Sequence, residues 1–322
     1  MAVYTEVSDE ELIAFVADYG IGEVTSCKGI AEGVENSNYL LNTTSGSYIL
    51  TLYEKRVNPD DLPFFLGLMA HLAGKGIACP TPLEDNKGEA LGQLCDRHAA
   101  IITFLDGMWP RRITPEHCAG VGAAMARLHL AGADFAIKRP NALSVDSWRS
   151  LLQASGARAD EVKPGLADLL TRELDELEAD WPDSGSVLPA GVIHADLFPD
   201  NVFFKSGALS GMIDFYFACN DVFAYDVAIC LNAWCFEADG SFNVTKARRL
   251  LTAYRKQRDF SDAELAALPL LARGSAMRFL LTRLYDWLNT PKDALVTPKD
   301  PLEYLEKLKF HQGVKGPGDY GL

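Results

Sequence analysis

Hydrophobic and polar residues follow a strand-like period in the first third of the chain and a helical period after it. The exception is an amphipathic helix at the start, which begins at the capping-box residue Ser8 and ends at Gly20. Residues 24–53 are then predicted to form strands, because β-forming side chains lie on both sides of a turn at 43–47. A helix is predicted over 60–75, and two further strands over 90–95 and 99–105.

Helical periodicity dominates beyond residue 106, where helices are predicted at about 114–131, 163–181, 222–238, 243–257, 262–288 and 301–309. One short strand pair, 202–204 with 209–213, interrupts them. The pattern predicts an α+β fold with two lobes. A small antiparallel β-rich lobe covers 1–105, a hinge lies at about 103–107, and a larger, mainly helical lobe covers 106–322. The glycine-rich tail at 313–318 is predicted to fray.

Composition indicates a globular protein and argues against some partners. Hydrophobic residues make up 48% of the 322 and charged residues 23%, which excludes a disordered or collagen-like chain. The net charge of -14 argues against nucleic acid or an anionic membrane, because both are bound through an excess of Lys and Arg. The seven cysteines form no C-x-x-C pair, no apolar run is long enough to span a membrane, and the N-terminus lacks a signal pattern. We therefore expect a cytoplasmic protein.

The most informative stretch for chemistry has the order His194-x-Asp196-x-x-x-x-Asn201, a hairpin, then an apolar residue followed by Asp214 and Phe215. This is the order of a kinase catalytic loop and its metal-binding Asp. Phosphoryl transfer needs a group that orients the attacking hydroxyl, and a carboxylate suits that task. It also needs hard oxygen ligands for Mg²⁺, which an amide and a second carboxylate supply. Asp and Asn are common in turns, so a lone His-x-Asp would be weak, but the three elements in order are specific.

These residues resemble the aminoglycoside phosphotransferase/choline kinase family, and the resemblance covers nearly the whole chain. It implies a protein-kinase-like two-lobe fold that uses ATP and Mg²⁺. Asp196 is then the catalytic base, Asn201 and Asp214 hold Mg²⁺, and His194 braces the catalytic loop. Asp226 matches the helix Asp that accepts hydrogen bonds from the loop backbone, although a carboxylate in a helical first turn can also simply lie at the surface.

The resemblance also implies a nucleotide site in the N-terminal lobe. The segment 29–38 lies between two predicted strands, where backbone N–H groups can bind phosphate, and Gly33, Ser37 and Asn38 are its candidates. Thr103, Phe104 and Leu105 fall at the hinge, where such folds bind adenine. The strand position that usually carries Lys or Arg matches Thr51, and the helix over 60–75 contains no Glu partner. Lys55 or Arg56 could bind the phosphates in place of the missing cation. The simpler interpretation is that both are a solvated charge pair.

Within the family, the stretches 33–39, 48–54 and 278–284 resemble the bacterial homoserine kinases. This implies ATP-dependent phosphorylation of the L-homoserine hydroxyl, a step of threonine biosynthesis. The alternatives are another small hydroxyl acceptor (choline, ethanolamine, an aminoglycoside or a sugar) or an inactive nucleotide-binding pseudokinase.

The acceptor site must be sought in the helical lobe. Arg278 and Arg283 are candidates for binding a substrate carboxylate. Arg273, Arg278 and Arg283 are five residues apart on one helix, so at most one or two of them line one cleft. Candidates for binding a substrate ammonium group are Tyr216, Asp221, Tyr285, Asp286 and Trp287. The oligomeric state stays open.

Overall fold

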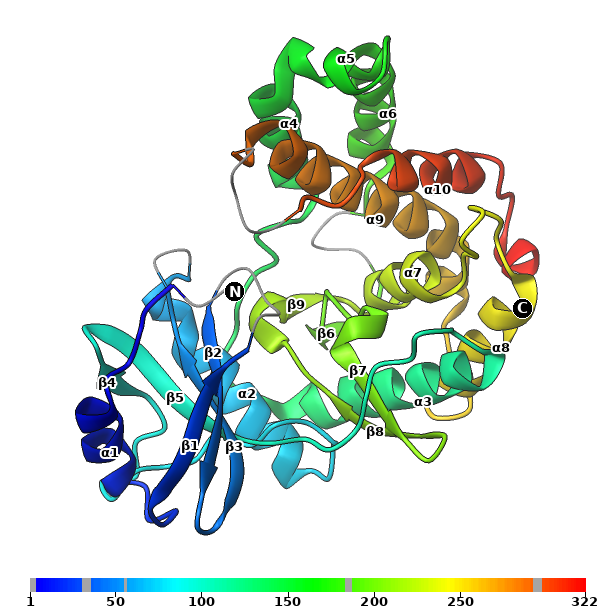
Figure 1. The fold of residues 1–322 in the computed structure, drawn as a ribbon. Helices are drawn as coiled ribbons and strands as arrows, with labels where there is room; N and C mark the ends of the chain where they lie inside the picture. The colour runs from blue at the N-terminus through cyan, green and yellow to red at the C-terminus, as the bar shows by residue number, and fades with distance from the viewer. Residues whose placement is uncertain (1–3, 31–35, 55–56, 183–186, 292–296) are drawn as a thin grey trace. The chain divides into compact units, whose positions relative to one another are not determined.

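The computed structural model describes residues 4–30, 36–54, 57–182, 187–291 and 297–322, which form two compact units (Figure 1). Unit 1 comprises Met1–Gly107, Phe135–Ile137 and Ser210–Tyr216; unit 2 comprises Met108–Asp134, Lys138–Leu209 and Phe217–Leu322. The first unit ends close to the predicted hinge. The two later segments of unit 1 were not expected there, because the sequence pattern places them in the helical lobe.

Unit 1 contains a five-stranded antiparallel sheet with two helices. Its elements are α1 (Asp9–Ala17), β1 (Val24–Gly29), β2 (Ser37–Thr43), β3 (Gly46–Leu52), α2 (Leu62–Gly74), β4 (Gly92–Leu94) and β5 (Arg97–Thr103). The strand order is β1-β2-β3-β5-β4. Strand β2 alternates buried and part-exposed residues along its whole length, as expected for a sheet with one face on a core. That core forms where β2, β3 and β5 contact the apolar side of α1.

The β4–β5 hairpin has a two-residue turn at Cys95 and Asp96, whose φ angles are 52° and 56°. Two positive φ angles are typical of a type I′ turn, whose twist matches that of the flanking strands. Neither residue is Gly, so the backbone is held in a left-handed conformation at the cost of some strain.

Unit 2 is mainly helical. Its helices are α3 (Pro115–Ala131), α4 (Val145–Ser155), α5 (Ala159–Val162), α6 (Leu166–Asp180), α7 (Phe223–Trp234), α8 (Val244–Arg255), α9 (Asp262–Asn289) and α10 (Leu302–Gln312). Strands β6 (Ala190–Ile193) and β9 (Cys219–Val222) pair antiparallel, with Ile193 opposite Cys219. Strand β7 (Val202–Lys205) pairs with β8 (Ala208–Met212), which begins in unit 2 and ends in unit 1.

Two sequence-based expectations for unit 2 need correction. Helix α4 and the β6–β9 pair were not predicted, and the predicted fraying of the tail was wrong. A 3-10 helix, Pro317–Tyr320, ends the chain, and Tyr320 is fully buried with its hydroxyl 2.8 Å from His311 Nδ1. The buried Tyr320 side chain therefore fixes the glycine-rich segment 313–318 that precedes it.

Helix α9 is long and apolar enough to cross a membrane by length and composition, whereas the sequence led us to expect no span. Within the described residues, 61% of its apolar window is buried against the rest of the structure. Core helices pass the same test, so this is weak evidence for a membrane span.

Candidate active site

The loop that follows β6 carries His194 and Asp196, and its backbone is held in an unusual conformation. Ala195 has a φ of 62°, in the left-handed region that a non-glycine residue seldom adopts. The loop then enters a short 3-10 helix, Pro199–Asn201, before β7 begins. Such a conformation persists only where the surrounding contacts fix it.

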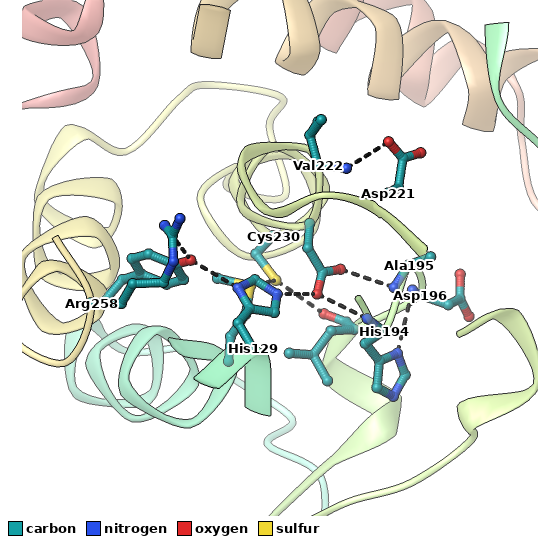
Figure 2. A network of polar contacts seen from close by, with 12 residues as sticks. His129, His194, Ala195, Asp196, Asp221, Val222, Cys230 and Arg258 are labelled. Carbon is teal, nitrogen blue, oxygen red and sulfur yellow. Dashed lines mark hydrogen bonds and ion pairs between the residues drawn. The ribbon is translucent and has the colours of Figure 1, made fainter. Parts of the chain in front are cut away.

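The carboxylate of Asp226, on α7, fixes the start of the loop (Figure 2). It is fully buried and accepts two backbone hydrogen bonds, from the Ala195 nitrogen at 2.9 Å and the His194 nitrogen at 3.0 Å. His129 Nε2, on α3, lies 3.0 Å from the same carboxylate and donates a third. Burial alone would raise the pKa of Asp226, but the hydrogen bonds and charge of His129, together with the loop contacts, hold that pKa below its ordinary value.

A chain of buried polar contacts continues from this carboxylate to α8 and α9. The Tyr254 hydroxyl lies 2.8 Å from His129 Nδ1 and accepts a hydrogen bond from Arg258 Nη1 at 3.2 Å. Arg258 in turn pairs with Glu264 at 2.8 Å, in the first turn of α9. Because both ring nitrogens of His129 are bonded, its orientation is fixed, and so is the donor that faces Asp226.

His194 and Asp196 differ in exposure. His194 is fully buried, and its Nδ1 accepts the Asp196 backbone N–H at 3.3 Å, so the ring braces the loop from below. The Asp196 side chain keeps 20% of its surface exposed. The next turn is anchored from α7, where Trp234 Nε1 donates to the Leu197 carbonyl at 2.8 Å. A carboxylate on a rigid, partly open loop is placed to act on a ligand.

Asn201 and Asp214 are the predicted metal ligands, and each can be assessed by itself. The buried Asn201 amide donates from Nδ2 to the Asp196 carbonyl at 2.8 Å, which leaves its Oδ1 without a hydrogen-bond donor among the described residues. An amide oxygen presented in this way suits a hard cation. Asp214 lies in unit 1, is exposed, and has a φ of 64°. In the described part of the chain, no group of three His, Cys, Asp or Glu side chains is arranged to hold a metal ion.

The three arginines of α9 go to three different places. Arg273 pairs with Glu173 and Glu176 of α6. Arg278 is 4% exposed and contacts the loop that follows β6, where Nη1 donates to the Ala195 carbonyl at 3.3 Å and is 3.8 Å from Asp196 Oδ1. Arg283 turns to α10 instead, where it pairs with Glu303 at 2.7 Å and covers the Tyr304 ring. The structure therefore brings Arg278, and not Arg283, to Asp196.

The predicted nucleotide-binding residues lie in unit 1 and are held to different degrees. Gly33, Lys55 and Arg56 fall outside the described residues. The fully buried Ser37 hydroxyl is already bonded to Glu54 and to the backbone of Tyr4 and Thr5, so its side chain has little left to offer a ligand. The Asn38 amide oxygen accepts from the Thr51 hydroxyl at 2.8 Å.

The predicted hinge contains both bonded and unbonded backbone. Thr103 pairs in β5 and also donates its backbone N–H to the Thr81 carbonyl at 2.9 Å. The backbone groups of Phe104 and Leu105 form no hydrogen bond with any described residue. Unpaired N–H and C=O groups on consecutive residues can bind the edge of a planar ring such as adenine.

The comparisons with known proteins identify the family. A model described as the phosphotransferase enzyme family matches residues 26–260. The chain belongs to this family. Relatives named homoserine kinase from Rhodospirillum rubrum and Nitrobacter winogradskyi are 66% and 67% identical to this phosphotransferase, over all of its chain and over 99% and 98% of theirs.

Solved structures agree on the fold of this phosphotransferase. An amicoumacin kinase in complex with AMP-PNP and Ca²⁺ has a TM-score of 0.73 at 17% identity, with 95% of this chain and 92% of that chain covered. A choline kinase from Cryptosporidium parvum has a TM-score of 0.67 at 16% identity, with 95% and 94% covered. The predicted kinase-like α+β fold is confirmed.

Sequence reasoning missed two residues that support the candidate catalytic loop of this phosphotransferase. His129 and Tyr254 sit on amphipathic helices, where nothing distinguishes them from ordinary core residues. Their partners lie 97 and 125 positions away along the chain, so no local pattern could have shown the contacts.

Proposed function

We propose that this phosphotransferase transfers the γ-phosphoryl group of ATP to the hydroxyl of L-homoserine. The identity of 66% over the full chain to a homoserine kinase supports that acceptor. The observation that carries the proposal is the position of Arg278 beside Asp196, with Nη1 3.8 Å from the carboxylate. The Asp196 carboxylate suits an acceptor hydroxyl, and the Arg278 guanidinium suits an acceptor carboxylate. Together the two side chains fit a hydroxy amino acid.

Asp196 is the proposed catalytic base. Its carboxylate accepts the hydrogen of the acceptor hydroxyl and aims the oxygen at the γ-phosphorus. The hydrogen bonds of Asp226 and His194 hold the loop so that this carboxylate does not have to be ordered during the reaction. Arg278 lies beside this carboxylate, with Nη1 3.8 Å from Asp196 Oδ1, where its charge favours an anionic acceptor.

Asn201 and Asp214 are the proposed ligands of Mg²⁺. The Oδ1 atom of Asn201, which accepts no hydrogen bond from a described residue, supports its assignment. A magnesium ion held by these two residues would supply positive charge to neutralise the phosphates of the nucleotide. The proposed nucleotide lobe is 1–105, with Gly33, Ser37 and Asn38 toward the phosphates and Thr103, Phe104 and Leu105 toward the adenine. The unpaired backbone of Phe104 and Leu105 supports the second group. The catalytic and substrate-binding lobe is 106–322, and the proposed location is the cytoplasm.

Removal of Mg²⁺ is expected to weaken ATP binding by about tenfold or more. ATP is a polyanion, the chain has a net charge of -14, and the strand position that usually carries a cation is Thr51. Thr51 carries no charge, and its buried hydroxyl is already bonded to Asn38 (1% of Thr51 is exposed), so it does not replace the missing cation. Calorimetric titration of ATP with Mg²⁺ and with excess EDTA, at equal ionic strength, measures the difference. Equal affinity in the two buffers would contradict the proposal.

A coupled ADP-release assay over a panel of acceptors tests the proposed function. We expect turnover with L-homoserine to exceed that with choline, ethanolamine, an aminoglycoside or a simple sugar by at least about 100-fold in kcat/KM, because Arg278 offers a carboxylate its bidentate partner. A preference for choline or an aminoglycoside would assign a different acceptor. Stabilisation by Mg²⁺–ATP without turnover on any acceptor would indicate an inactive nucleotide-binding protein.

A further inference from the structure

Two buried groups and one half-buried carboxylate near the catalytic loop lack a hydrogen-bond partner or a countercharge among the described residues. Arg278 uses Nη1 for its contacts with Ala195 and Asp196, and neither its Nε nor its Nη2 bonds a described residue. The Tyr225 hydroxyl, on a side chain only 1% exposed, has no hydrogen-bond partner in the described chain. A buried polar group without a partner costs free energy, so each such group needs an explanation.

Asp221 is the third group. It is half-buried at the end of β9, where its carboxylate accepts the Asn141 amide at 2.7 Å and the Val222 backbone N–H at 2.7 Å. Figure 2 shows the contact with Val222. No Lys, Arg or His in the described chain forms an ion pair with it. Burial raises the pKa of Asp221 above its ordinary value, and the two hydrogen bonds offset only part of that rise. A largely dehydrated carboxylate without a cation is suited to receive one from a ligand.

The fold brings these groups together inside unit 2. Strand β9 leads directly into α7, so Tyr225 follows Asp221 by one helical turn, and α7 packs against α9, which carries Arg278. The Arg278 guanidinium carbon also lies 5.5 Å from the centre of the Phe217 ring, two residues before β9. Burial raises the pKa of Tyr225, the charge of Arg278 lowers it and that of Asp221 raises it, so both charges act on this hydroxyl.

We propose that Asp221, Tyr225 and Arg278 recognise the charged groups of a zwitterionic amino-acid acceptor, an assignment that rests on the proposed function. The acceptor's α-ammonium group binds Asp221. Its α-carboxylate binds the Nε–Nη2 edge of Arg278 and accepts a hydrogen bond from the Tyr225 hydroxyl. Three carbon–carbon bonds separate carboxylate and hydroxyl-bearing carbon in homoserine, so one molecule can reach Arg278 and Asp196 together.

The other candidates for an ammonium site fit less well. Tyr285 and Trp287 are 42% and 45% exposed and Asp286 is exposed as well, so none of the three provides a dehydrated surface. The Tyr216 hydroxyl pairs with that of Tyr53 within unit 1. Asp221 combines partial burial with a carboxylate that no cation of the described residues neutralises, which selects it from the set.

Steady-state kinetics of Asp221→Asn with matched acceptors tests the proposal. The change keeps the shape of the side chain and removes its charge. We expect KM for L-homoserine to rise about 30-fold, because truncating one partner of a buried charge pair has an effect of this size. Turnover at saturation should stay within about threefold of wild type. For 4-hydroxybutanoate, which lacks the amino group, kcat/KM should not change. The exposed Asp168→Asn, in the first turn of α6, is the matched control and should leave both acceptors unaffected.

Tyr225→Phe provides an independent arm. Because the hydroxyl has no hydrogen-bond partner among the described residues, its loss should leave the melting temperature unchanged or slightly higher. KM should rise about fivefold for both homoserine and 4-hydroxybutanoate, which share the carboxylate.

The outcomes separate this proposal from the proposed function. If the wild type neither binds nor phosphorylates homoserine, the proposed function fails and the amino-acid site fails with it. The recognition site alone is refuted if the wild type is active and Asp221→Asn has the same KM for homoserine. It is also refuted if Asp221→Asn lowers kcat/KM equally for homoserine and for 4-hydroxybutanoate.

Discussion

Replacing Asp196 by Asn is expected to lower kcat by about 10²- to 10⁴-fold, the usual contribution of a general base. Asn cannot accept the hydrogen of the acceptor hydroxyl as a carboxylate does, but it fills the same volume on the loop. The fold should tolerate the change. Arg278 keeps its hydrogen bond to the Ala195 carbonyl and its position over the Phe279 ring, with 3.9 Å between guanidinium carbon and ring centre. We therefore expect a melting temperature within about 2 °C of wild type.

The measurement is the single-turnover and steady-state rate of ADP release, together with a thermal melt of each variant. Asp200→Asn is the matched control, because it alters a carboxylate on the same loop whose side chain is 55% exposed and faces Lys299. That control should retain wild-type turnover. A rate for Asp196→Asn within a few-fold of wild type would remove Asp196 from the chemistry, and an equal loss in both variants would point to a general effect of loop charge.

The candidate site residues that could be predicted from the sequence all lie in one short stretch of the chain. His194, Asp196, Asn201 and Asp214 fall within a motif whose spacing is set by a turn and a hairpin. The first three of these share one loop in unit 2, where Asn201 and His194 both bond Asp196. Because residues close in sequence are also close in space, most of the local geometry of such a motif can be predicted from its spacing.

Contacts between distant segments could not be predicted in the same way. Strands β6 and β9 are four residues each and pair Ile193 with Cys219 across the whole catalytic segment, so neither shows a pattern of its own. The burial of Tyr320 depends on His311 of α10 in the same way. Asp221 was one of five ammonium candidates, and only its surroundings in the fold distinguish it. When a residue's role depends on the residues that pack around it, the sequence shows only the residue type. The role becomes visible only in the fold.

Replacing Asp226 by Asn is expected to lower both stability and turnover, because one side chain serves the fold and the loop together. Asn has one acceptor oxygen and would turn an NH₂ group toward a backbone N–H of His194 or Ala195. Breaking a buried charge-assisted arrangement of this kind costs about 3–5 kcal/mol. For a chain of this size that lowers the melting temperature by about 10 °C. Small displacement of Asp196 should also lower kcat by about 10- to 100-fold.

The pH dependence gives this prediction its sharpest test. Interactions that favour the ionised form hold the pKa of Asp226 below its ordinary value, so the stabilisation is complete above the unfolded-state pKa near 4. It is lost as the pH falls through the lower folded-state pKa. The difference in unfolding free energy between wild type and Asp226→Asn should therefore be constant from about pH 8 to 5 and shrink below about pH 4.

Urea titrations at a series of pH values measure that difference, and kcat at neutral pH reports the loop. If Asp226→Asn does not accumulate in folded form, Tyr254→Phe tests the same network one step further out. It removes the hydroxyl that lies 2.8 Å from His129 Nδ1 and should lower the stability by about 1–2 kcal/mol, with a smaller loss of kcat. Destabilisation that stays constant down to pH 3, with unchanged kcat in the folded variant, would show that Asp226 contributes packing alone. The catalytic loop would then owe its left-handed turn at Ala195 to other contacts.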